Sequence, residues 1–339
     1  MNFKKKYLVG GPARCGKTTL TNIIRTHKYV AGMPFESLFH VYFLRIYPFK
    51  QFQKRIILSE WMRHSLSMNE AETKFGKPLD YFKSDFNSIA KQIPKSSKHQ
   101  IQIISSALDV FVKENNAKTW VAHDIHAERL FAEYKKYIPD LHLIIMLRDP
   151  RETICSSLYW RCYPQKNVRE CELLKYRTIM WIFSAEAYIH LKKIYPNDVS
   201  MFYFNDFTSD NIENLEKLSC FLGINTKTIK SFFVKKQDYS FTDGKFLTPE
   251  GNLSSLITNE EQVFIEYFTE YYYKMFNWDF VTNLNAKNRD NSTILNFSKL
   301  LTGALKLMNK SSRESYEFIQ RNFEFSKKSY FVQKYKFWI

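Results

Sequence analysis

A run of residues near the start of the chain has the types and spacing needed to bind phosphate. Residues 11–18, GPARCGKT, place a glycine at each end of a short stretch and follow the second with Lys17 and Thr18. In such a loop, backbone N–H groups and the positive end of the next helix surround a phosphate. The lysine adds a charge, and the threonine hydroxyl can bond an oxygen or a metal ion. We therefore predict a phosphate-binding P-loop formed by Gly11, Pro12, Ala13, Arg14, Cys15, Gly16, Lys17, Thr18 and Thr19.

The elements around this loop predict a parallel β-sheet. The loop follows a short apolar strand and opens a helix, and residues 141–147, LHLIIML, are continuously apolar, as expected of a strand buried on both faces. Further strands are predicted at 119–123 and 199–204, and helices at 127–137, 153–159, 172–195 and 211–222. This alternation is typical of an α/β protein with three layers, in which helices flank a central parallel sheet. Ligands of such sheets bind at the carboxyl ends of the strands.

The remaining segments are predicted to surround this sheet. Residues 29–49 contain glycine and proline and are predicted as a loop, which carries Glu36 as a lone acid in an apolar setting. Apolar residues at helical spacing predict a helical insertion at about 50–117, broken near 76–78 and Pro94. We expect one α/β domain over residues 1–285 and a basic helical extension over 286–339.

Composition limits the class of protein and its partners. The 339 residues are 45% apolar and 17% aromatic, which excludes disorder as the main state, and the net charge of +16 implies an anionic partner. The basic residues are dispersed, so nucleic acid is not expected. No apolar run is long enough to cross a bilayer and no signal peptide is recognised, which indicates a cytoplasmic protein. The five cysteines are odd in number and form no CxxC pair, so we expect neither disulfides nor a zinc site.

Residues 143–157, LIIMLRDPRETICSS, resemble the strand, loop and helix that hold the 3′-phosphate of the donor in sulfotransferases. The family pattern is a strand that ends in Arg, then Asp or Asn and Pro, and a Ser eight residues after the Arg. Arg148, Asp149, Pro150 and Ser156 match it. A guanidinium offers a bidentate contact to phosphate, and a hydroxyl on the next helical turns completes the contact.

Other segments are similar to the same family in the same order. The loop and its helix match the family's Arg-Ser-Gly-Thr-Thr segment, and residues 201–224, MFYFNDFTSDNIENLEKLSCFLGI, match its Tyr-Glu-Asp-Leu strand end and following helix. The resemblance covers about residues 7–224, and more weakly 245–278. The chain departs from the pattern at Lys17, where most members have Thr, and at Phe204 and Asn205, where the family has Tyr and Glu.

The resemblance implies a donor and a role for each matching residue. The donor is 3′-phosphoadenosine-5′-phosphosulfate (PAPS), and no metal ion is required. Arg14, Lys17 and the loop amides would stabilise the leaving 5′-phosphate, while Arg148 and Ser156 would hold the 3′-phosphate. Arg148 could instead form a surface salt bridge with Asp149, and the Ser156 hydroxyl could face solvent or a backbone carbonyl. Arg151, which follows the motif, is predicted to be solvated.

The sulfotransferase reaction also needs a general base for the proton of the acceptor hydroxyl or amine. Glu36 is the first candidate, because a carboxylate in a partly apolar pocket can have a suitably raised pKa. A capping or surface role is its alternative. His123 and His126 are rival bases, since some family members use a histidine after the corresponding strand.

Two other functions remain open from the sequence. The complete GxxxxGKT run also suits a Mg²⁺-dependent kinase of a small molecule, for which Asp124 is the candidate metal-positioning acid. A non-catalytic nucleotide-binding protein is the second. The acceptor of a sulfotransferase would be a small molecule or carbohydrate. The basic C-terminal tail, which ends KYKFWI, is either a helical appendage that packs on the domain or on a partner, or a basic amphipathic segment that lies on a membrane surface.

Overall fold

The structure is a computed structural model of the whole chain. The residues that it describes are 5–25, 27–37, 39, 54–63, 78–125, 127–162, 171–204, 212–224, 257–278, 291–308 and 314. Within these ranges, no helix is both long and apolar enough to cross a membrane.

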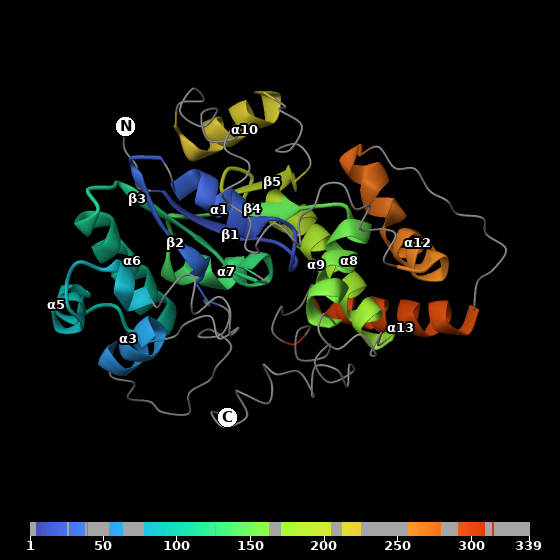
Figure 1. Cartoon of the computed structure of the whole chain (residues 1–339), viewed down its shortest axis with the longest axis horizontal. Coiled ribbons are helices and arrows are strands. Elements are labelled where there is room, and N and C mark those ends of the chain that lie inside the picture. Colours follow the sequence, from blue (N-terminus) through green and yellow to red (C-terminus); the bar gives the residue numbers. More distant parts are fainter. Residues whose placement is uncertain are drawn as a thin grey trace. The chain divides into compact units, whose positions relative to one another are not determined.

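A sheet of five parallel strands forms the centre of the fold, in the order β2-β3-β1-β4-β5 (Figure 1). The strands are β1 (Lys6–Gly10), β2 (Val30–Glu36), β3 (Thr119–His123), β4 (Leu141–Leu147) and β5 (Val199–Tyr203). β3 and β4 are buried along their whole length, as expected for strands that are covered on both faces. The chain passes to one side of β1 for β2 and β3 and then to the other for β4, so the carboxyl end of β1 lies at the switch point where open α/β sheets bind ligands.

The predicted loop at residues 29–49 is wrong in its first part, because Val30–Glu36 forms strand β2. Gly32 and Pro34 in this stretch predict an interruption of regular secondary structure. Among the described strands, β2 pairs only with β3 and lies at the edge of the sheet. Its register shifts between Gly32 and Glu36, around Pro34. Proline lacks the N–H that an inner strand needs, but it is tolerated at an edge or at such an irregularity. Residues 38 and 40–49 of the predicted loop lie outside the described part of the chain.

Cα proximity divides the chain into two compact units, and the first contains the sheet. Unit 1 comprises residues 1–11, 16–147 and 190–243, and unit 2 comprises 12–15, 148–189 and 244–339. The helices of unit 1 are α1 (Lys17–Arg25), α3 (Lys54–Arg63), the 3₁₀ helix η1 (Pro78–Tyr81), α5 (Phe86–Gln92), α6 (Gln100–Glu114), α7 (Ala127–Tyr137) and α10 (Ile212–Leu222). The described residues of the predicted insertion at about 50–117 form α3, η1, α5 and α6, while residues 50–53 and 64–77 lie outside the described part. The domain boundary predicted at residue 285 stays a prediction.

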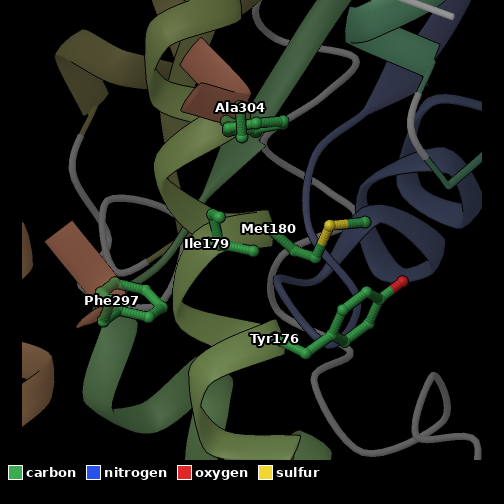
Figure 2. Packing of buried hydrophobic residues seen from close by; sticks show 6 residues of the cluster. Tyr176, Ile179, Met180, Phe297 and Ala304 are labelled. Carbon is green, nitrogen blue, oxygen red and sulfur yellow. The ribbon is translucent and has the colours of Figure 1, made fainter. Parts of the chain in front are cut away.

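Unit 2 is helical and has its own hydrophobic core. Its helices are α8 (Pro150–Cys162), most of α9 (Cys171–Ile194), α12 (Asn259–Phe276) and α13 (Asn291–Met308). Figure 2 shows Tyr176, Ile179 and Met180 of α9 in a cluster with Phe297 and Ala304 of α13. Phe264 and Phe268 of α12 pack against the same cluster. The described part of the predicted helical extension is α13, which buries Phe297 and Ala304 in this core. Residues 286–290, 309–313 and 315–339 lie outside the described part.

Candidate functional site

The predicted phosphate loop connects β1 to α1 and has the backbone angles that its glycines permit. Gly11 has φ 124° and Gly16 has φ 95°, both in the region that favours glycine. Arg14 also has a positive φ, 68°, which is uncommon for a residue with a side chain. The loop thus turns sharply between the end of the strand and the start of the helix. Strained backbone of this kind is common where a ligand is held.

Phe204, at the end of β5, packs directly over Gly16. A Cβ atom added at Gly16 would lie 2.2 Å from Cδ2 of the Phe204 ring. An alanine at position 16 would therefore clash with this ring. Its backbone would also be strained, because φ is positive at this position.

Lys17 is buried at the start of α1, and its Nζ donates to the carbonyl oxygen of Gly11 at 3.0 Å. The side chain therefore curls back onto the loop and holds its positive charge beside the turn. Thr18, the next residue, lies 3.1 Å from His123 through its Oγ1 and the ring Nε2. The two residues that give the loop its chemistry are thus fixed by neighbours within unit 1.

His123, a rival candidate base, ends β3 beside the loop and is fully buried. Burial and then the positive charges of Lys17 and Arg25 lower its pKa from 6.5 to about 3. Its Nδ1 atom is buried and has no hydrogen-bond partner in the described part of the chain. The imidazole is therefore neutral near neutral pH and is a weak proton acceptor.

Glu36, the first candidate base, is the last residue of β2 and pairs in register with His123. It is half-buried. The next residue fixes this strand end, because Ser37 N donates to the carbonyl oxygen of His123 at 2.8 Å and Trp61 Nε1 donates to Ser37 O at 3.0 Å. The sheet therefore brings both candidate bases to one edge. His126, the other rival, lies outside the described residues.

The predicted 3′-phosphate residues gather in unit 2 with the arginine of the loop. Arg14 Nε donates to Ser156 Oγ at 3.3 Å. Burial and then the charge of Arg148 lower the pKa of Arg14, so the two guanidinium groups are close enough to repel each other. A bound anion would relieve this repulsion. The cluster of Arg14, Arg148 and Ser156 therefore suits a phosphate group.

The alternative pairing of Arg148 with Asp149 is wrong. Arg148 Nε donates to Glu152 Oε2 at 2.7 Å, and the Arg148 side chain is only 14% exposed. Asp149 instead pairs with Arg151, whose NH2 lies 2.7 Å from Asp149 Oδ2. Arg148, which precedes α8, is thus held by Glu152 in the first turn of that helix and remains beside Arg14.

Two contacts of predicted site residues, one within each unit, could not be predicted from the sequence. The buried Glu128 of α7 accepts a hydrogen bond from Gly11 N through Oε2 at 2.7 Å, and Trp181 Nε1 of α9 donates to Arg148 O at 2.9 Å. Glu128 lies in the first turn of a helix, where an acid ordinarily indicates only a favourable interaction with the helix dipole. Trp181 lies in an apolar helix, where it indicates only core. Nothing in the spacing links either residue to its partner.

The other predicted loop residues lie where the sequence puts them. Pro12 and Cys15 are buried in the turn, Ala13 is half-buried, and Thr19 is in the first turn of α1. Their role in binding stays a prediction. Among the described residues, no group of three or more His, Cys, Asp or Glu side chains could hold a metal ion.

Comparison with protein families gives a result that agrees with this geometry. The model of the sulfotransferase family matches residues 8–228, which include the loop, the sheet and the Arg148 motif. The chain belongs to the sulfotransferase family. A search of curated protein sequences found no significant match.

Solved structures show the same fold at low sequence identity. The sulfotransferase domain of the olefin synthase of Synechococcus PCC 7002 is 12% identical, has a TM-score of 0.52, and aligns over 83% of this chain and 97% of its own. The sulfotransferase domain from the curacin biosynthetic pathway is 11% identical, also has a TM-score of 0.52, and aligns over 83% of this chain and 100% of its own. At such identities the likeness concerns the fold alone.

Proposed function

We propose that the protein transfers a sulfuryl group from PAPS to a hydroxyl or amine of a small-molecule or carbohydrate acceptor in the cytoplasm. Membership of the sulfotransferase family implies a sulfuryl donor. The observation that carries the choice of PAPS is the cluster of Arg14, Arg148 and Ser156, in which two close guanidinium groups and a buried hydroxyl suit the 3′-phosphate. ATP has no phosphate at that position.

In this proposal the loop binds the 5′-phosphosulfate end of the donor. The acceptor oxygen or nitrogen forms a bond to sulfur while the bond from sulfur to the bridging oxygen breaks, and the electron pair stays on that oxygen. Lys17, Arg14 and the loop N–H groups stabilise the charge that develops there. The Lys17 side chain already lies against the loop through its bond to Gly11 O, which supports this role. The protein groups supply the positive charge, so we expect no need for a metal ion.

The proton of the acceptor passes to Glu36 in this scheme. Glu36 and His123 are register partners at the carboxyl ends of β2 and β3, the end of the sheet where ligands of such folds bind. The low pKa of His123, caused by burial and by Lys17 and Arg25, makes its imidazole a poor base at neutral pH. We therefore assign His123 the task of orienting the Thr18 hydroxyl.

The assignment of the base predicts different effects for the two substitutions. Glu36→Gln should lower kcat by about two to four orders of magnitude, since it removes general-base catalysis, and should leave donor affinity unchanged. His123→Gln, which can still bond Thr18, should cost less. The rate should show no inflection near pH 6.5, because His123 stays neutral well below that value. A larger loss for His123→Gln, together with such an inflection, would make His123 the base.

The donor assignment is tested without knowledge of the acceptor by measuring which nucleotides the unaltered chain binds. The same measurement addresses the two other functions, because a kinase would bind ATP with Mg²⁺. A non-catalytic protein would bind the nucleotide but would turn over no acceptor, so Glu36→Gln would have no activity to lose. Membrane contact by the basic tail stays a prediction.

A further inference from the structure

Arg151, three residues after Arg148, is not the solvated arginine that the sequence predicts. Its guanidinium is held at both ends, since NH2 lies 2.7 Å from Asp149 Oδ2 and NH1 lies 3.1 Å from Glu266 Oε1 of α12. Its side chain is 18% exposed. Burial opposes its charge, but the hydrogen bonds and charge of Asp149 outweigh this effect and raise the pKa of Arg151. Arg151 therefore joins the phosphate motif to a helix more than a hundred residues later in the sequence.

The buried carboxylate of Glu266 is unfavourable for the stability of the fold. Its side chain is completely buried, and one oxygen, Oε1, accepts from both Arg151 and Gln262 Nε2, the latter at 2.8 Å. The other oxygen, Oε2, is buried without a hydrogen-bond partner among the described residues. A buried carboxylate that is only half satisfied lowers stability compared with an apolar residue of similar size. Helix packing alone would be better served by leucine, so the carboxylate points to a role beyond packing.

The carboxylate acts on the start of α8, which carries the phosphate motif. Asp149, held by Arg151, accepts from Arg151 N through Oδ1 at 2.8 Å, and its carbonyl accepts from Thr153 N at 2.8 Å. These bonds fix the first turn of the helix. The adjacent carbonyl of Arg148 is held by Trp181 Nε1 at 2.9 Å. The backbone that aims Arg148 and Ser156 is therefore fixed by α9 on one side and, through Arg151, by Glu266 of α12.

We propose that Glu266 is a positioning residue for recognition of the donor's 3′-phosphate. It orients Arg151, Arg151 orients Asp149, and Asp149 fixes the turn from which Arg148 and Ser156 project. Glu266 lies outside residues 8–228, the range that the family model matches, so this support comes from the C-terminal part of the chain. The inference rests on the proposed function, because it assumes that Arg148 and Ser156 bind that phosphate.

Glu266→Gln tests this role with little change in volume. The amide can accept from Arg151 but lacks the charge, so Arg151 should be held less firmly. Isothermal titration of the full chain should show affinity for adenosine 3′,5′-bisphosphate reduced about tenfold, with affinity for adenosine 5′-monophosphate unchanged. Glu266→Ala should change the ratio of the two affinities at least as much. Thermal unfolding of each variant shows whether it is folded.

Glu186→Gln is a matched control. Glu186 of α9 also bonds α12, since its Oε1 accepts from Tyr272 OH at 2.6 Å, but this contact does not involve Asp149 or Arg151. The control should leave the ratio of affinities as in the unaltered chain. If Glu266→Gln is folded and keeps that ratio, Glu266 is only structural and the inference is wrong. If the unaltered chain itself does not prefer the bisphosphate, the proposed function fails instead.

Discussion

Replacement of Lys17 by alanine is expected to lower turnover by about two to three orders of magnitude, the usual cost of losing one group that stabilises charge in a transition state. The positive charge of Lys17 is held in the loop at 3.0 Å from Gly11 O. It is needed most when the bridging oxygen separates from sulfur and becomes negative. Binding of both the bisphosphate and ATP should weaken by about tenfold, since the two ligands share the 5′-phosphate end.

Lys136→Ala is the control for net charge in that experiment. Lys136 is 63% exposed and pairs with Glu133 on the surface of α7. Its loss lowers the net charge by the same amount, away from the loop. Steady-state kinetics should separate the two variants. Equal losses in both would mean that Lys17 acts only through the overall field of this basic protein.

Replacement of Arg148 by alanine should affect one ligand and spare the other. A charge-assisted contact to phosphate contributes roughly 1.5–3 kcal/mol, so affinity for adenosine 3′,5′-bisphosphate should fall by about one to two decades. Affinity for ATP should hardly change, because Arg148 acts on the 3′ side of the ribose in our proposal. Titration calorimetry with both ligands measures the contrast.

The ion pair of Arg148 with Glu152 requires a control of its own. Arg148→Ala leaves the Glu152 carboxylate without this partner, and that charge would itself repel an anion. The double variant Arg148→Ala and Glu152→Ala removes both charges. If the double variant regains the affinity of the unaltered chain, Arg148 only neutralises Glu152 and does not read the 3′-phosphate.

The inner strands could be predicted well from the sequence because burial on both faces gives them a continuous apolar pattern. Residues 119–123 and 141–147 were predicted with the bounds that β3 and β4 have. The same holds for α7 at 127–137. α10 ends at the predicted residue, Leu222, and the φ of 67° at the following Gly223 allows the chain to leave the helix. The hydrophobic pattern of a segment is sufficient to predict its type and bounds where all of its residues are in the same environment, as in a strand buried on both faces.

β2 and the partners of the phosphate motif could not be predicted because they depend on position in the fold. Proline and glycine exclude an inner strand but not an edge strand, and the sequence does not state where a strand lies in the sheet. Phe204 over Gly16 and Glu266 on Arg151 join residues far apart in the chain. The types of the site residues were therefore predictable, but the residues that hold them in place were not.

The most direct test of the account is isothermal titration of the unaltered chain, in EDTA, with adenosine 3′,5′-bisphosphate and with ATP. The cluster of Arg14, Arg148 and Ser156 predicts micromolar binding of the bisphosphate without a metal ion, and much weaker binding of ATP. Micromolar binding of ATP that needs Mg²⁺, with no binding of the bisphosphate, would contradict the proposal that PAPS is the donor.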